Sequence, residues 1–175
     1  MKIKHLIICL LAFSMALTSC GPDNEEYADK VIGNYNMTIT PNLVLKYVGQ
    51  SIPLDFNEIS TTCSIAKVDE QGNIVMNIKG VNGEVNDMEM KGYCSGLGMK
   101  LEDSSYDGIF VADTYTRLDC NLKFDNPTVS ITNAKVLNWS TTVSGKCEMD
   151  FDGSGAVITC DVSGTIGFYG TYITK

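Results

Sequence analysis

An all-β fold, a single antiparallel β-barrel of about eight to ten strands, is predicted for residues 31–175. Apolar and polar side chains alternate with a period of two along much of this region, turn residues separate the alternating segments, and no sustained helical period is present. Many short strands with glycine-marked turns are typical of antiparallel barrels and also of β-sandwiches, so a sandwich remains the alternative. The chain of 175 residues suits one domain.

The alternation is clearest in three segments, residues 35–39, 74–78 and 118–124. In each of them isoleucine, leucine, methionine, cysteine or an aromatic residue occupies every second position, which predicts a strand with one buried and one solvated face. Residues 84–91 fit either a strand or a single helical turn. Turn chemistry separates the segments at residues 70–73, 107–108, 125–127 and 152–155.

The N-terminus has the organisation of a secretory signal, with a basic start at residues 2–5 and an apolar core at residues 6–16. This core is too short to span a membrane, which requires about 20 apolar residues. Residues 17–20, Leu-Thr-Ser-Cys, resemble the lipobox of bacterial lipoproteins. The resemblance implies cleavage of residues 1–19 and acylation of Cys20 by palmitate-type chains, which would anchor the protein firmly in a membrane.

The segment 20–30 contains the lipidated Cys20 and a polar, acidic stretch without an apolar period, which predicts a short flexible tether before the domain at residues 31–175. Its acidic cluster resembles the surface-export signal of Bacteroidota lipoproteins. The resemblance implies a lipid-anchored protein of the bacterial outer membrane that faces outside.

Two short motifs carry a further resemblance, Gly33-Asn34-Tyr35 at the start of the first strand and residues 167–172 in the last one. With the leader and the length, they resemble the calycin-like barrels of Bacteroidota lipoproteins, which are relatives of lipocalins, fatty-acid-binding proteins and avidins. Tyr35 stands where lipocalins have tryptophan, and no arginine near the C-terminus can stack on it. Lipocalin-type ligand binding is therefore not implied.

Charge and composition exclude several classes of function. The net charge is −8, and removal of Lys2 and Lys4 with the leader makes it −10, which disfavours nucleic acid and anionic membrane surfaces as partners. The only histidine, His5, lies in the leader. The mature chain therefore lacks Ser–His and Cys–His dyads and histidine-ligated metals, and no cofactor is expected.

Residues 150–161 match the oxygen spacing of a calcium-binding EF-hand loop. The flanking residues alternate as strands, whereas an EF-hand needs helices, so a β-turn is favoured and Asp150 with Asp152 remains a candidate for a weak calcium site. Glu102, Asp103 and Asp107 are the acidic residues from which a glycosidase pair could be drawn, with solvated loop charge as the alternative.

Tyr106, Tyr115 and Trp139 lie near predicted turns. They are candidates for an aromatic rim that contacts a sugar or a peptide, and the alternative is that they cap the end of a barrel core.

Five cysteines follow Cys20, at positions 63, 94, 120, 147 and 160, and none are spaced as a zinc or redox motif. Cys120 suits a core position, and an exported protein permits disulfides. If Gly153 and Ser154 form a two-residue hairpin loop, the residue numbers of any two residues opposite each other on the flanking strands add up to 307. Cys147 then lies opposite Cys160, at a non-hydrogen-bonded site. This pair is the disulfide candidate.

These observations predict a lipid-anchored module of the cell envelope that binds a protein or glycan partner at the cell surface, or assists one, without catalytic activity. One alternative is a carrier of a small apolar ligand inside the barrel, and another is a carboxylate-based glycan hydrolase. Large inward side chains would argue against the carrier, because a barrel of about eight strands filled in this way leaves no cavity.

Overall fold

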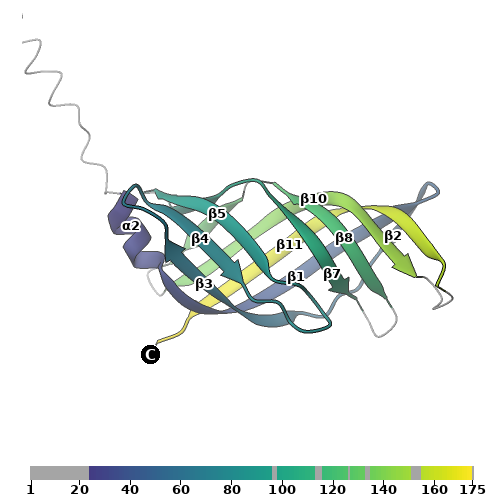
Figure 1. Ribbon diagram of the computed structural model, residues 1–175, viewed down its shortest axis with the longest axis horizontal. Coiled ribbons are helices and arrows are strands. Elements are labelled where there is room, and N and C mark those ends of the chain that lie inside the picture. The colour runs from purple at the N-terminus through teal and green to yellow at the C-terminus, as the bar shows by residue number, and fades with distance from the viewer. Residues whose placement is uncertain are drawn as a thin grey trace, which may run out of the picture.

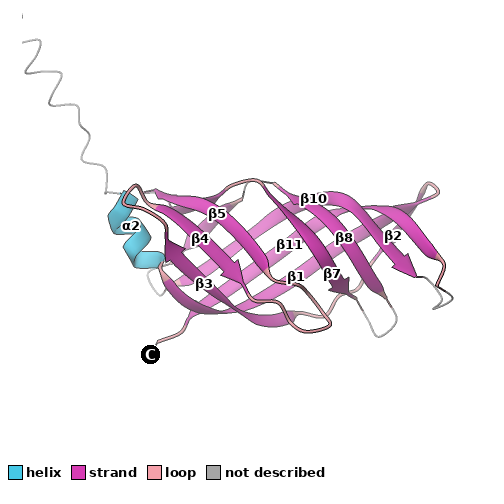
Figure 2. Cartoon of the chain, viewed as in Figure 1, coloured by secondary structure: helices cyan, strands magenta, loops and turns pink. Residues whose placement is uncertain are grey.

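The computed structural model describes residues 24–95, 98–112, 116–125, 127–132, 135–150 and 155–174, which form one helix and eleven strands (Figures 1 and 2). These elements are α2 (Asn24–Val31), β1 (Gly33–Tyr47), β2 (Gln50–Pro53), β3 (Ile59–Lys67), β4 (Asn73–Ile78), β5 (Met88–Ser95), β6 (Gly98–Leu101), β7 (Ser104–Val111), β8 (Arg117–Phe124), β9 (Thr128–Ile131), β10 (Val136–Asp150) and β11 (Val157–Tyr172).

Eight of the strands close into an antiparallel barrel in the order β1, β3, β4, β5, β6, β9, β10 and β11, and β11 pairs with β1 to complete the circle. The other three strands extend its wall: β2 pairs with β1, β8 pairs with β10, and β7 pairs with β8. The predicted all-β barrel is confirmed, and the sandwich alternative is excluded.

The long strands change partners along their length. Strand β1 pairs first with β3, at Gly33–Ile39, and then with β2, at Val44–Tyr47. Strand β10 likewise pairs with β9 near its start and with β8 from Val143 to Glu148. The molecule is therefore elongated, with α2 at one end and the turn between β1 and β2 at the other (Figure 1).

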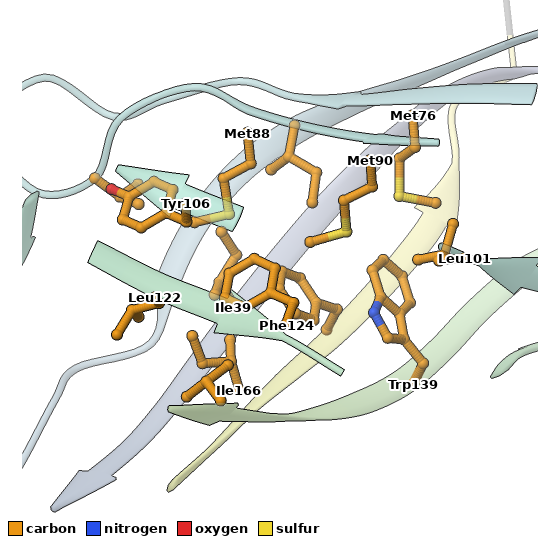
Figure 3. Close-up of a cluster of buried hydrophobic side chains, with 14 of the residues drawn as sticks. Ile39, Met76, Met88, Met90, Leu101, Tyr106, Leu122, Phe124, Trp139 and Ile166 are labelled. Atoms are coloured by element: carbon orange, nitrogen blue, oxygen red, sulfur yellow. The ribbon is translucent and has the colours of Figure 1, made fainter. Parts of the chain in front are cut away.

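Large side chains fill the interior. Methionine and aromatic residues from opposite walls meet there, among them Met76, Met90, Phe124 and Trp139 (Figure 3). An eight-stranded barrel has an interior just wide enough for side chains to fill.

Helix α2 corrects the prediction of a flexible tether for residues 24–30, whereas residues 20–23 lie outside the described residues. Ala28 and Val31 are fully buried in the core, and the Tyr35 hydroxyl donates a hydrogen bond of 2.6 Å to the Val31 carbonyl. Two apolar residues three positions apart form a narrow helical stripe that covers the end of the barrel. Residues 24–31 are thus part of the folded unit, while Cys20 lies outside the described residues.

The turn predicted at residues 107–108 is also wrong, because both residues lie within β7. A Cβ atom on Gly108 would come within 2.8 Å of the Tyr106 hydroxyl and 2.9 Å of Asn86. Glycine is therefore needed there for a close approach and not for a turn. In the ambiguous segment 84–91, strand β5 begins at Met88. No helix in the described part of the chain is long and apolar enough to cross a membrane.

Candidate binding face

Four adjacent strands present only uncharged side chains on their outer side over most of their length. We call this surface the polar face; it consists of Asn34, Asn36, Thr38, Thr40 and Asn42 on β1, Ser60, Thr62 and Ser64 on β3, Asn138, Ser140, Thr142 and Ser144 on β10, and Ser163, Thr165, Tyr169 and Thr171 on β11.

Tyr169 is the one aromatic side chain in the polar face, and 48% of it is exposed. The strand register places Asn138 on one side of it and Thr38 on the other, and Ser60 continues the same row on β3. Amide and hydroxyl groups therefore flank an aromatic ring on both sides.

The charges of this acidic protein lie around the polar face. Lys146 and Asp161 form an ion pair of 3.4 Å where β10 and β11 continue beyond it. Lys79 and Asp87, 3.9 Å apart, stand at its border beyond β3. Exposed pairs of this kind contribute little to stability, but they delimit a patch in which neutral hydrogen-bonding groups predominate.

A groove of about 640 Å³ lies at this border. Asn34, Thr62 and Ser64 of the polar face line one side. Glu89 of β5 and Lys79, which directly follows β4, are among the residues that line the other. A second hollow of about 570 Å³ shares Lys79 and Asp87 with the groove and continues it under the loop at residues 80–87.

Side-chain hydrogen bonds hold this loop in place. The Asp87 carboxylate accepts the Gly80 N–H at 2.6 Å, and the Asn86 side-chain oxygen accepts the Ile109 N–H at 2.9 Å. The Tyr106 hydroxyl accepts the Asn86 N–H at 3.0 Å and donates to the Ile109 carbonyl. The second hollow thus has a wall fixed by hydrogen bonds to strand β7.

The predicted aromatic rim is not formed by Tyr106 and Trp139. They are 3% and 4% exposed and belong to the core, which agrees with the core-capping alternative. Burial raises the pKa of Tyr106 to about 12. Tyr115 lies outside the described residues. Reasoning from sequence missed Tyr169, although a signal was present: every second residue from Asn34 to Asn42 is asparagine or threonine.

The acidic residues considered for glycan hydrolysis are not brought to one site. Asp103 lines a hollow beside Lys123 and Asp125, whereas Asp107 lines the hollow under the 80–87 loop. Glu102 is exposed directly after β6 and lines neither hollow.

The calcium candidate lies at the far end of β10. The Asp150 carboxylate accepts the Gly155 N–H at 2.9 Å, and Asp150 pairs with Val157 across the hairpin. Strands flank this segment where an EF-hand would have helices. Asp152 lies outside the described residues, among which no group of three or more His, Cys, Asp or Glu side chains is arranged to hold a metal ion.

The predicted register of β10 and β11 is confirmed, because Cys147 lies directly opposite Cys160 and Met149 opposite Ile158. On its other side, Cys147 also lies opposite Cys120 of β8, a neighbour that reasoning from sequence missed. All three cysteines are buried free thiols, and so are Cys63 and Cys94. Burial raises the pKa of Cys63 to about 12 and that of Cys94 to about 11.

No protein-family model and no curated protein sequence matches this chain. The closed eight-stranded antiparallel barrel is consistent with a calycin-like fold. The similarity of this chain to calycins is therefore a similarity of fold architecture.

Proposed function

We propose that this protein is a lipid-anchored binding module of the cell envelope, without catalytic activity, and that its polar face and the adjoining groove bind a neutral glycan. The observation that carries the proposal is the uncharged surface of asparagine, serine and threonine around Tyr169.

The chemistry of this surface favours a neutral, hydroxyl-rich ligand. Amide and hydroxyl side chains both donate and accept hydrogen bonds, as sugar hydroxyls do. Because neither the surface nor such a ligand is charged, binding removes no charged group from water. A charged ligand would have to give up part of its hydration and would meet no opposite charge in the polar face. The exposed ring of Tyr169 offers an apolar surface with a polar tip, which suits a sugar ring with an apolar side and hydroxyl edges.

Two observations weigh against the alternative functions. Tyr35, Met37, Phe110 and Phe168 are almost fully buried inside the barrel, where a carrier would hold its apolar ligand. The separation of Asp103 from Asp107 into different hollows weighs against a carboxylate-based hydrolase.

The lipobox-like sequence at Cys20 supports the anchor, and the acidic residues after it support display on the outer face of the outer membrane. Helix α2 begins four residues after Cys20, a distance of about 14 Å at full extension. An anchor at Cys20 would thus keep the α2 end of the barrel close to the membrane.

A glycan-binding measurement with two tyrosine variants tests the proposal. Full-length protein is titrated with a panel of neutral and anionic polysaccharides, and the same titration is repeated with Tyr169→Ala and Tyr93→Ala. Tyr93 is the matched control, because it is a 39% exposed tyrosine on β5, outside the polar face.

We expect a neutral polysaccharide to bind, Tyr169→Ala to weaken binding at least tenfold, and Tyr93→Ala to leave it unchanged. Added salt should have little effect, because screening acts on charges. Binding of anionic polysaccharides alone, or equal effects of the two variants, would refute the proposal.

A further inference from the structure

Three buried cysteines lie side by side on adjacent strands: Cys120 on β8, Cys147 on β10 and Cys160 on β11. Cys147 is directly opposite both of the others, which are separated from each other by β10. Any disulfide in this row must therefore include Cys147, and the two possible partners compete for it.

Backbone hydrogen bonds distinguish the two pairs. Along an antiparallel strand, successive residues direct their N–H and C=O groups to opposite neighbouring strands. The Asp125 N–H donates to the Thr142 carbonyl at 3.1 Å. Thr142 and the other even-numbered residues of β10 therefore direct their backbone N–H and C=O groups to β8. Cys147 is odd-numbered and directs its backbone groups to β11.

The neighbouring strands give the same result independently. The Ala112 N–H donates to the Thr116 carbonyl at 2.9 Å, so the even-numbered residues of β8, with Cys120 among them, face β7. The Ile173 N–H donates to the Asn34 carbonyl at 2.8 Å, so the even-numbered residues of β11, including Cys160, face β10.

Cys147 and Cys160 thus form a hydrogen-bonded pair, which corrects the expectation of a non-hydrogen-bonded site. Cys120 and Cys147 form the non-hydrogen-bonded pair. Cα separations of about 5.5 Å and about 4.5 Å in the two kinds of pair would both permit a disulfide. The Cβ atoms decide, since a disulfide needs them about 3.5–4.5 Å apart, and opposite Cβ atoms come closest in non-hydrogen-bonded pairs.

We propose that oxidation of this protein joins Cys120 to Cys147 and leaves Cys160 as a thiol beside the bond. The pKa of Cys147 is lowered, chiefly by a hydrogen bond with the Cys120 thiol. The same hydrogen bond raises the pKa of Cys120. Cys147 is therefore the thiol that ionises first.

The oxidant is a small-molecule disulfide such as oxidised glutathione, and it reaches Cys147, which is 1% exposed, when the pairing of β8 with β10 opens locally. The Cys147 thiolate attacks it, one thiolate leaves, and a mixed disulfide forms on Cys147. Cys120 then loses its proton and attacks the Cys147 sulfur, which expels the second thiolate. The two cysteines lose two protons and two electrons in total, and the oxidant becomes two thiols. The bond fastens β8, and with it the β7–β8 hairpin, to the barrel strand β10.

Trypsin digestion distinguishes the possible products. Cleavage after Arg117, Lys123 and Lys146 places Cys120 in the peptide 118–123, while Cys147 and Cys160 share the peptide 147–175. Full-length protein is oxidised with oxidised glutathione, alkylated, digested without reduction and analysed by mass spectrometry. We expect the two peptides to be cross-linked, with an alkylated Cys160. A peptide 147–175 that is lighter by two hydrogens, or alkylation of all three cysteines, would overturn the proposal.

Three variants provide a second measurement. Cys120→Ala should lower the extent of oxidation at least tenfold at the same glutathione ratio, whereas Cys160→Ala should leave it unchanged. Cys63→Ala is the matched control, because Cys63 is buried in β3 opposite Ile78 and outside the row. Thermal unfolding of each reduced variant verifies that it folds. Equal effects of Cys120→Ala and Cys160→Ala would contradict the proposal, and the tryptic map of the unmodified sequence decides independently of any variant.

Discussion

Trp139 on β10 stacks on Phe168, its direct neighbour on β11, with ring centroids 4.6 Å apart and ring planes 7° from parallel. The indole Nε1 of Trp139 is buried and has no hydrogen-bond partner among the described residues. The core therefore combines a favourable ring contact with an unpaired donor, which costs about 1–3 kcal/mol when it is buried.

Replacement of Trp139 separates these two effects. Trp139→Phe keeps a ring on Phe168 and removes the unpaired N–H, so we expect it to lower the free energy of unfolding by less than about 1.5 kcal/mol. Trp139→Ala also removes the ring and should cost about 3–5 kcal/mol. Urea unfolding followed by circular dichroism measures both, since Trp139 is the only tryptophan and its fluorescence is lost. Equal losses would mean that the ring contact with Phe168 contributes nothing to stability.

Gly145 on β10 marks a place where two strands approach closely. A Cβ atom there would lie 2.0 Å from the Asn121 carbonyl oxygen and 3.0 Å from the Leu122 Cα. Gly145→Ala should therefore push β8 away from β10 and lower the free energy of unfolding by about 2–4 kcal/mol.

Gly167 on β11 is the matched control for Gly145. The nearest atoms to a Cβ atom at this position, in Thr40, are 3.8 Å away, so Gly167→Ala should be neutral or stabilise by about 0.5 kcal/mol. Thermal unfolding of the two variants compares them directly. A smaller loss for Gly145→Ala than for Gly167→Ala would contradict this account of the β8–β10 contact.

The raised pKa of Tyr106 predicts a loss of stability at alkaline pH. Burial raises its pKa from 10.0 to about 12, so the folded protein resists ionisation of a group that ionises more readily when unfolded. The contribution of Tyr106 to the free energy of unfolding is fully present below about pH 10. It is lost as the pH rises through about 12, and the total loss is roughly 2 kcal/mol.

The comparison with Tyr106→Phe measures this contribution. The variant loses the hydrogen bonds to Asn86 and Ile109 and should be less stable than the wild type near neutral pH. Its deficit should shrink at about pH 11, because it has no phenol to ionise. The buried cysteines titrate in both proteins and cancel in the difference. Urea unfolding at the two pH values tests this, and a constant deficit would argue against the raised pKa.

Alternation and turn chemistry in the sequence predicted the barrel, individual strands and one pairing, but not the order of the strands around the barrel. The period-two pattern of residues 118–124 identifies β8 and its buried face, and the turn chemistry at residues 152–155 gave the correct register of β10 and β11. A pattern of this kind shows which face of a strand is buried, but not which strand lies beside it. The pairing of Cys147 with Cys120 was therefore not predictable from the same residues.

Two other features depended on information that the local sequence lacks. The sum of paired positions fixes a register, but the alternation of hydrogen-bonded pairs depends on the geometry of the turn, so the Cys147–Cys160 pair was assigned to the wrong kind of site. In α2, Ala28 and Val31 form an apolar stripe too short to distinguish from a polar tether until the open end of a barrel is present to bury it. The polar face, in contrast, was readable as asparagine and threonine at alternate positions.

The anchor at Cys20 is testable without knowledge of the ligand. If Cys20 is the acylated first residue of the mature protein, Cys20→Ala should move the protein from the membrane fraction to the soluble fraction, because no other part of the lipobox-like sequence carries a thiol. Cys9→Ala is the matched control, since Cys9 lies in the cleaved leader and its loss should change nothing. The intact mass of the membrane-extracted protein should exceed that of residues 20–175 by the acyl groups. If Cys20→Ala still sedimented with membranes like the wild type, the anchor would lie elsewhere, and the placement of the α2 end near the membrane would have to be abandoned.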